Sequence, residues 1–307
     1  MKDVFGNFVI QKVIEHGPED HILSLFDSIK ENILELTKHI YGWRVIQKFI
    51  EIFSKNQDCN IFLIIEEILK NNLLEWIYDQ YGNHVVQKLI EKVPYEDISF
   101  IQKQIEGNWK QLWLNTFGWR VIQRLIEYCP VNWTDPIYDQ IINNYVIELC
   151  KDQYGNYVVQ HILEKGNRIS DKKSICHCLL GDVRLLSVHK YASNVVEKWI
   201  EYCEEEDKCL LIEELLGDNN WDSVEENMSL YKMMDNRYGN YVVQKAIEQA
   251  TCDQITILQN KIISSKLQEN QSSNYVKHVI SWLERLSLSS TETTSTTLST
   301  GVQGKEN

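Results

Sequence analysis

One seven-residue motif occurs seven times in the chain, and this repetition limits the possible folds more than any other feature. Each copy has an aromatic residue, Gly or Ala, two variable residues, two aliphatic residues and a final Gln or Glu. The copies end at Gln11, Gln47, Gln87, Gln123, Gln160, Glu197 and Gln244. Successive copies are 36 to 40 residues apart, except for the last interval of 47 residues. Periods of about 20–50 residues are typical of solenoids, whose stacked repeats bury a core that no single repeat could bury alone.

The apolar residues of each repeat have helical spacing. Ahead of the motif they recur at Ile22, Phe26 and Ile29, and within the third copy the aliphatic pair continues one turn later at Leu89 and Ile90. The 307 residues include only 13 Gly and 4 Pro, which is a low content of helix breakers. We therefore predict an all-α solenoid of about seven repeats, each with one helix ahead of the motif and a second that begins at the motif's Gly or Ala.

The repeats predict a domain at 1–286 and a disordered, Ser/Thr-rich tail at 287–307. The long last interval contains a polar, loop-like segment at Gly217–Asn227. Ser273–His278 resembles the motif but lacks its final Gln or Glu, so we expect a C-terminal capping half-repeat there. At the other end the chain starts close to its first motif, which would leave Val9, Ile10, Val13 and Ile14 facing solvent; we expect that an upstream repeat is missing from this sequence.

Composition and motifs exclude several classes of protein. No stretch approaches the ~20 apolar residues of a membrane-spanning helix, and no basic start precedes a long apolar core, so we expect a cytoplasmic protein without membrane contacts. The eight cysteines form no C-x-x-C pair, and Cys176 and Cys178 have no second ligand pair at zinc-site spacing. Because no catalytic constellation occurs either, we expect no metal, no cofactor and no enzymatic activity.

Three positions of each motif, the first, second and fifth after the Gly or Ala, lie on one side of a helix. The seven triplets are Asn7/Phe8/Gln11, Trp43/Arg44/Gln47, Asn83/His84/Gln87, Trp119/Arg120/Gln123, Asn156/Tyr157/Gln160, Ser193/Asn194/Glu197 and Asn240/Tyr241/Gln244. Their amides and carboxylate suit hydrogen bonds to base edges, and their flat side chains suit base stacking. This pattern favours binding of a single strand, base by base. Alternatively, the Asn and Gln side chains form a ladder that only joins neighbouring repeats, although such a ladder needs no aromatic residues or arginines.

Motifs such as Gly-Asn-Tyr-Val-Val-Gln and Ala-Ser-Asn-Val-Val-Glu resemble the RNA-binding helices of the Pumilio (PUF) family. The resemblance extends from Phe5 to about Leu286. It implies a right-handed crescent whose concave face holds single-stranded RNA antiparallel to the chain, with one base per repeat. First and fifth positions would contact the Watson–Crick edge of the base, and the second would stack between bases.

The resemblance also implies a target sequence, 5′-U-G-U-A-U-A-U-3′, read from the C-terminal repeat. U would be bound by Asn240/Gln244, Asn156/Gln160, Asn83/Gln87 and Asn7/Gln11, G by Ser193/Glu197, and A by Gln123 and Gln47. The stacking residues would be Phe8, Arg44, His84, Arg120, Tyr157, Asn194 and Tyr241. Glutamate suits guanine, because it only accepts hydrogen bonds and guanine presents two donors.

Two repeats depart from the family pattern. Its adenine-binding repeats usually carry a small residue such as Cys or Ser at the first position, before Arg, whereas this chain has Trp43 and Trp119 there. An indole donates one hydrogen bond and fills far more space. The indole either packs on the base or excludes the base from the repeat. In the second case the base is splayed out, and the repeat does not discriminate between bases.

The net charge of −13 disfavours a polyanion ligand. However, a basic or titratable residue directly follows every fifth position: Lys12, Lys48, Lys88, Arg124, His161, Lys198 and Lys245. These side chains form either a basic track along the RNA-binding face or ion pairs with the glutamates three residues further on.

The resemblance thus implies a monomeric protein that binds UGUA-type elements in mRNA 3′ untranslated regions. It implies post-transcriptional repression in the cytoplasm, with deadenylation or translation-repression factors as partners. Two other functions stay open: an armadillo-like protein-binding scaffold, and a nucleolar relative that binds ribosomal RNA with little sequence preference.

Overall fold

The computed structural model describes residues 1–54, 61–166, 168–217, 230–266 and 274–283. Every secondary-structure element in these ranges is a helix, which agrees with the predicted all-α fold. The chain divides into two compact units, residues 1–171 and residues from Lys172 onward. The described parts contain no helix that is both long and apolar enough to cross a membrane. The tail at 287–307 and most of the polar segment at Gly217–Asn227 lie outside the described residues.

The motif helices begin where the sequence predicts, at the Gly or Ala of each copy. They are α1 (Gly6–His16), α4 (Gly42–Phe53), α7 (Gly82–Lys92), α10 (Gly118–Tyr128), α13 (Gly155–Lys165), α16 (Ala192–Tyr202) and α19 (Gly239–Gln249). A helix ahead of the motif is also present for the second to seventh copies, as an outer helix, and a further outer helix, α20, follows the last copy. The outer helices are α2 (Glu19–Asp27), α5 (Ile61–Lys70), α8 (Ser99–Ile105), α11 (Val131–Gln140), α14 (Ile169–Leu179), α17 (Glu205–Leu216) and α20 (Cys252–Lys266).

Between each of the first six outer helices and the next motif helix lies a short third helix that the sequence analysis missed. These helices are α3 (Ile33–Thr37), α6 (Leu73–Tyr78), α9 (Trp109–Trp113), α12 (Val146–Lys151), α15 (Val183–Ser187) and α18 (Leu230–Asp235). A 3₁₀ turn at Lys30–Asn32 precedes α3, and a π-helical turn at Ile141–Tyr145 precedes α12. The residues 274–283, which include most of the expected half-repeat, are helical.

The short helix explains why most copies of the motif have glycine, although Ala192 occupies this position at the start of α16. A Cβ on Gly82 would lie 2.7 Å from the carbonyl oxygen of Trp76 in α6, which is closer than a Cβ atom approaches a backbone oxygen. The start of α7 is held there by Asp79, whose Oδ1 accepts hydrogen bonds from the backbone N–H groups of Tyr81 (2.8 Å) and Gly82 (2.7 Å). Asp3, His39, Asn115, Asp152, His189 and Asn236 accept the same bonds in the other repeats. The seven triplets therefore occupy equivalent places on equivalent helices.

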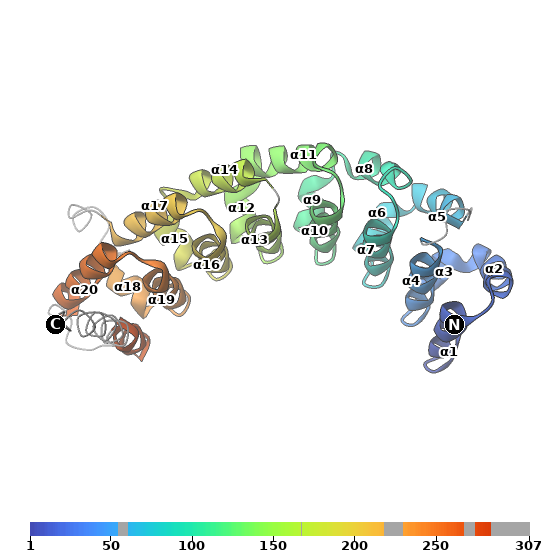
Figure 1. Cartoon of the computed structure of the whole chain (residues 1–307), viewed down its shortest axis with the longest axis horizontal. Coiled ribbons are helices and arrows are strands. Elements are labelled where there is room, and N and C mark those ends of the chain that lie inside the picture. Colours follow the sequence, from blue (N-terminus) through green and yellow to red (C-terminus); the bar gives the residue numbers. More distant parts are fainter. Residues whose placement is uncertain (55–60, 167, 218–229, 267–273, 284–307) are drawn as a thin grey trace, which may run out of the picture. The chain divides into compact units, whose positions relative to one another are not determined.

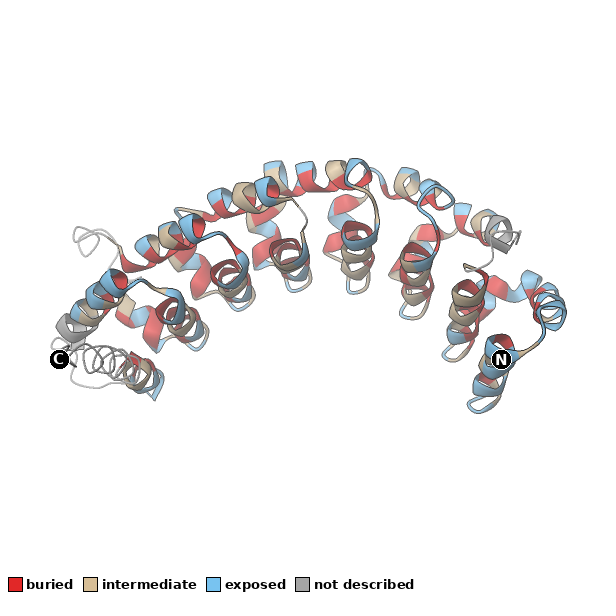
Figure 2. Cartoon of the chain, in the orientation of Figure 1, coloured by how far each residue is buried: buried red, intermediate tan, exposed pale blue. Residues whose placement is uncertain are grey.

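In the first unit the motif helices pack on each other in chain order, α1 on α4, α4 on α7, α7 on α10 and α10 on α13, with the outer helices in a second row (Figure 1). From α4 to α13 the aliphatic motif residues, among them Val45, Val85 and Val121, are fully buried. Buried residues concentrate where the rows meet (Figure 2). An aromatic cluster adds to this core, since the ring of Phe49 lies 5.3 Å from that of Phe26 and 6.0 Å from that of Phe53.

In the second unit α16 packs on α19, and α17 packs on α15 and α20. Its core includes Trp199, Met233 and Met234, all fully buried. The buried Sγ atoms of Cys176 and Cys203 lie 3.2 Å apart as unlinked thiols, and the contact with Cys203 together with burial raises the pKa of Cys176.

At the N-terminal end, α1 exposes part of its apolar surface. Val9 and Val13 are exposed, as predicted, with 61% and 41% of their surface accessible. The prediction is wrong for Ile14, which is fully buried because α1 packs on α4 along that side, and Ile10 is half-buried.

Candidate nucleic-acid interface

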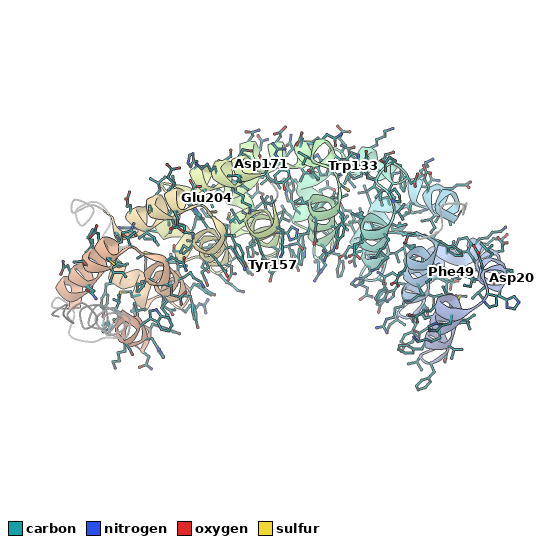
Figure 3. The ribbon with its side chains drawn as sticks, in the orientation of Figure 1. Asp20, Phe49, Trp133, Tyr157, Asp171 and Glu204 are labelled. Carbon is teal, nitrogen blue, oxygen red and sulfur yellow. The ribbon has the colours of Figure 1, made fainter. Side chains whose placement is uncertain are left out.

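The second positions of the triplets lie on the side of the motif helices that faces away from the outer helices. In the first unit, Tyr157 of α13 points away from the layer that carries Trp133 and Asp171 (Figure 3). Several second-position rings are open to solvent: 54% of the Phe8 surface, 45% of Tyr157 and 57% of Tyr241 are accessible. Such exposed flat rings, repeated once per helix, are suitable surfaces for stacking bases.

Four repeats combine a first-position Asn with a fifth-position Gln, and the structure joins the two side chains. Asn83 is buried, and its Nδ2 donates a hydrogen bond to the carbonyl oxygen of Asp79 (2.8 Å). Its Oδ1 accepts a hydrogen bond from Nε2 of Gln87 (2.8 Å). The same Gln-to-Asn bond occurs from Gln11 to Asn7, from Gln160 to Asn156 and from Gln244 to Asn240.

In three of the four repeats this arrangement places the predicted base-edge residues at two depths, because Gln11, Gln160 and Gln244 are half-buried above buried Asn side chains, whereas Gln87 is itself buried. The four Asn side chains are buried, and they orient the Gln amides that lie above them. The amide of each Gln also carries a second N–H and a carbonyl oxygen, which are a donor and an acceptor side by side. Uracil offers the complementary pair, an N3–H donor beside a carbonyl acceptor, so a Gln held in this way can recognise it.

The repeat of α16 has different chemistry. Ser193 is buried, Asn194 is exposed and Glu197 is half-buried. Burial raises the pKa of the Glu197 carboxyl group, while Lys245 and Lys198 lower it and Glu201 raises it further. An ionised carboxylate only accepts hydrogen bonds, which fits the two adjacent donors of guanine and no other base edge as well.

The two Trp repeats do not form the Asn–Gln arrangement. Instead, the indole of Trp43 stacks on the imidazole of His84 in the next repeat, with ring centroids 4.6 Å apart and an interplanar angle of 21°. Trp119 stacks on Tyr157 in the same way, at 4.7 Å and 23°. The fifth-position amide of Gln47 donates to the carbonyl oxygen of His84 (2.5 Å).

The second Trp repeat has an equivalent hydrogen bond to the next motif helix, in which Nε2 of Gln123 donates to the carbonyl oxygen of Tyr157 (2.8 Å). The ladder hypothesis is therefore correct for Gln47 and Gln123, whose amides join neighbouring repeats. It does not describe the other four Gln side chains, whose bonds stay within their own helix.

Arginines adjoin these indoles at the second positions. The guanidinium carbon of Arg44 lies 5.3 Å from the ring centroid of Trp43, and that of Arg120 lies 4.4 Å from Trp119. Burial, and then the charges of Arg120 and Arg44, lower the pKa of His84, so its imidazole is neutral at neutral pH. A neutral ring beside two cations is a suitable stacking partner.

The basic residues that follow the fifth positions form ion pairs in the structure. Lys88 Nζ lies 2.9 Å from Glu91, and equivalent pairs join Lys12 to Glu15, Lys48 to Glu51, Arg124 to Glu127, Lys198 to Glu201 and Lys245 to Glu248. Burial lowers the pKa of His161 at the remaining position. The structure therefore supports ion pairing with the glutamates, and these side chains do not form a strongly basic track.

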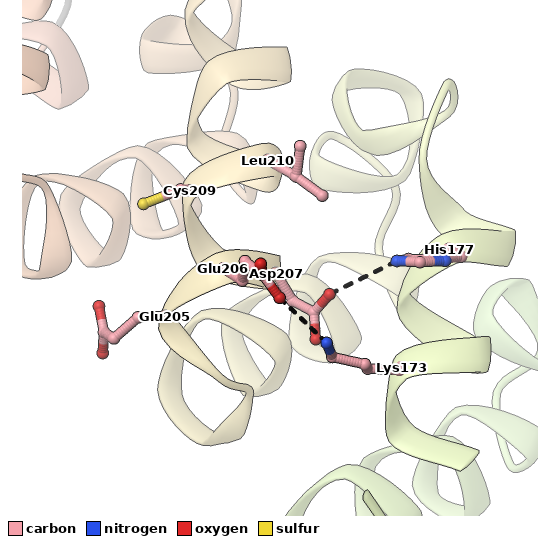
Figure 4. Close-up of a pocket in the computed structure, with 7 residues that line it drawn as sticks. All are labelled: Lys173, His177, Glu205, Glu206, Asp207, Cys209 and Leu210. Carbon is pink, nitrogen blue, oxygen red and sulfur yellow. Dashed lines mark hydrogen bonds and ion pairs between the residues drawn. The ribbon is translucent and has the colours of Figure 1, made fainter. Parts of the chain in front are cut away.

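A separate hollow lies on the outer helices of the second unit, between α14 and α17 (Figure 4). Lys173 Nζ lies 3.0 Å from Glu206, and His177 Nε2 lies 3.6 Å from Asp207 Oδ1. Lys173 and His177 therefore face acidic partners within the hollow, and no triplet residue lines it. Among the described residues, no three His, Cys, Asp or Glu side chains are grouped so that they could hold a metal ion.

Comparison with known proteins agrees with this geometry. The model of the Pumilio-family RNA binding repeat matches residues 1–30, 32–69, 72–106, 115–142, 145–180, 182–216 and 231–263. Meiotic PUF family protein 1 of Schizosaccharomyces pombe is 32% identical over 258 residues, 84% of this chain and 44% of that protein. A Pumilio domain-containing protein of the same yeast is 29% identical over 262 residues, 85% of this chain and 36% of that protein.

Solved structures of RNA complexes have the same fold. The Puf3 RNA-binding domain bound to a Cox17 RNA 3′ UTR recognition sequence has a TM-score of 0.80 and 32% identity, over 92% of this chain and 82% of that one. PUF-8 in complex with PBE-RNA has a TM-score of 0.80 and 31% identity, over 92% and 80%. This chain spans less than half the length of the curated relatives described above. This family consists of RNA-binding repeats and not of enzymes, as expected from the sequence. The chain is an all-α solenoid that belongs to the Pumilio family.

Proposed function

We propose that this chain binds single-stranded RNA along its triplets and prefers 5′-U-G-U-N-U-N-U-3′, of which UGUA-type elements are one case. The observation that carries the proposal is the Asn–Gln bond, which recurs with the same geometry in four repeats and orients an amide for uracil. Numbering the bases from the 5′ end, Glu197 would bind G2. The Gln residues 244, 160, 87 and 11 would bind U1, U3, U5 and U7.

The biological role is part of the same proposal. The ligand in the similar Puf3 structure is a 3′ UTR recognition sequence. By this similarity we propose that the chain acts on mRNA 3′ untranslated regions, in the cytoplasm and as a monomer, to repress translation or reduce mRNA stability. Deadenylation or translation-repression factors would be its protein partners.

A selection from randomised RNA, with the purified chain at near-physiological salt, tests the binding preference. We expect enrichment of UGU followed by U at positions 5 and 7. A folded protein that enriched no sequence would instead support the protein-binding scaffold. Enrichment of RNA without a shared motif would support binding of ribosomal RNA with little sequence preference.

The paired lysines predict a shallow salt dependence. If all seven residues after the fifth positions neutralised phosphates of a single strand, log affinity would fall with log salt at a slope of roughly −5. Because six of them are engaged with glutamates, we expect a slope of about −1 or shallower. Affinities measured across a series of KCl concentrations check this value, and a slope near −5 would show that RNA displaces the glutamates and uses the whole track.

The raised pKa of Glu197 predicts that recognition of G2 weakens on acidification. Guanine needs the ionised carboxylate, and protonation begins at a higher pH than for a glutamate with the ordinary pKa of 4.5. We expect the preference for G over A at position 2 to decrease as the pH falls from neutral toward the raised pKa of Glu197, as measured by competition binding. Discrimination at U3 and U5 should persist, because amides do not titrate in this range.

The sign of the linkage separates this effect from unfolding. A carboxyl group whose pKa is raised in the folded state binds its proton more tightly there than in the unfolded chain. Through this group, acidification favours the folded state while it weakens G2 binding. The control variant Glu197→Gln should show no such pH dependence at position 2, and if it retained the wild-type profile, Glu197 would not be the responsible group.

A further inference from the structure

Each Trp repeat contains a ring where the stacking hypothesis requires space for a base. Base stacking uses the second-position side chains of adjacent repeats, here Arg120 of α10 and Tyr157 of α13. The indole of Trp119 already stacks on Tyr157, with centroids 4.7 Å apart, and the guanidinium of Arg120 lies 4.4 Å from the same indole. The indole is therefore in contact with both partners that a base would use.

The edge contacts of this repeat are also engaged within the protein. Nε2 of Gln123 donates to the carbonyl oxygen of Tyr157 (2.8 Å). Nε1 of Trp119 and Nη1 of Arg120 both donate to the carbonyl oxygen of Thr116, at 3.1 Å and 2.9 Å. These three bonds hold the fifth-position amide and both flat groups in place without any ligand.

The earlier Trp repeat has the same design. Trp43 stacks on His84 at 4.6 Å, Arg44 lies 5.3 Å from the indole, and Gln47 donates to the carbonyl oxygen of His84. Two independent copies of one arrangement, both within the first unit, indicate a structural role and not a chance rotamer.

A base that entered either slot would have to break the ring stack, the cation–π contact and the Gln bond. The base would then make a ring stack, a cation–π contact and a hydrogen bond with the same side chains that the indole contacts now. Its nucleotide would also lose conformational entropy. Nothing in this exchange favours the base. In the four Asn–Gln repeats, by contrast, no described side chain stacks between consecutive repeats in this way.

We propose that Trp43 and Trp119 fill the base slots of their own repeats, so that the nucleotides at positions 6 and 4 of the RNA are turned outward and not discriminated. This inference rests on the proposed function and makes it more specific. The chain would recognise five bases, U1, G2, U3, U5 and U7, interrupted by two unrecognised nucleotides.

Binding of 5′-U-G-U-N-U-N-U-3′ RNAs to the full chain tests this inference. Exchanging A for C, G or U at positions 4 and 6 should change Kd by less than about 3-fold, whereas exchanging U3 or U5 should weaken binding at least about 10-fold. An adenine preference of about 10-fold or more at positions 4 and 6, with UGU still required, would overturn the inference but leave the proposed function intact. Failure of the folded chain to bind any of these RNAs would overturn both.

Variants of Trp119 give a second test with a matched control. Trp119→Ser opens the slot between Arg120 and Tyr157 and should create a preference for A at position 4, without changing position 6. Trp119→Phe keeps a ring in the slot and should leave position 4 undiscriminated. If Trp119→Ser folded, bound UGU and still showed no base preference at position 4, the indole would not be what excludes the base.

A fluorescent base reports where the nucleotide lies. With 2-aminopurine at position 4, we expect its emission to stay high when the wild-type chain binds, because the base remains unstacked. The Trp119→Ser variant should quench this emission by stacking the base on Tyr157. Strong quenching by the wild-type chain would overturn the proposal, since it would place the base against a ring of the protein.

Discussion

Replacing Ser193 by Asn and Glu197 by Gln should change the preference at position 2 of the RNA from G to U. The introduced carboxamides would reproduce the pair seen in α7, where Asn83 donates to a carbonyl oxygen four residues earlier and Gln87 donates to Asn83. The carbonyl oxygen of His189 lies at the equivalent place, since it accepts the backbone N–H of Ser193. A well-placed pair of hydrogen bonds discriminates between bases by about 1–3 kcal/mol, so we expect roughly a 10- to 100-fold shift in relative affinity.

Competition binding between UGU- and UUU-containing RNAs measures this shift. The reciprocal variant Asn83→Ser/Gln87→Glu is the matched control, and it should move the preference at position 5 from U toward G while leaving position 2 unchanged. If the first variant folded and bound RNA yet still preferred G at position 2, base-by-base recognition by these triplets would be wrong.

Phe49→Ala should cause a large loss of stability. Phe49 is fully buried in α4, and its ring contacts those of Phe26 and Phe53. Truncating a buried Phe to Ala removes its transfer free energy and leaves a cavity, which together lower the free energy of unfolding by about 3–5 kcal/mol. Urea denaturation followed by circular dichroism measures this change.

Phe8→Ala is the matched control for this core variant. It makes the same substitution at a ring that is 54% exposed on α1, so the free energy of unfolding should change by no more than about 0.5 kcal/mol. RNA affinity should fall instead, because loss of a stacking ring costs about 1–3 kcal/mol. A large stability loss in Phe8→Ala with unchanged RNA affinity would show that this ring supports α1 and does not contact RNA.

The starts of all seven motif helices could be predicted from the sequence because they depend on local features. The motif's Gly and the helical spacing of the apolar residues both act within a few residues. The short helices were missed, because five or six residues are too few to show a period. Leu73, Trp76 and Ile77 do have helical spacing, and with the capping Asp79 they were the available signal.

The depth of the first position could not be predicted in the same way. Helical geometry places Asn83 and Gln87 on one side, but burial of Asn83 depends on its bond to the carbonyl oxygen of Asp79. The contacts of Gln47 and Trp43 with His84 depend on how two repeats stack, which residue spacing within one repeat does not determine. The sequence thus showed that the Trp repeats were exceptional, and only the structure shows what the indoles contact.

The bonds between Asn and Gln also determine when conformational entropy is lost. A long side chain ordered at an interface loses freedom worth about 0.5–1.5 kcal/mol. Gln11, Gln87, Gln160 and Gln244 are ordered by their Asn partners when the chain folds, before RNA arrives. The entropic penalty of association therefore falls mainly on the RNA, whose bases must give up their own stacking and mobility to meet amides that are already in place.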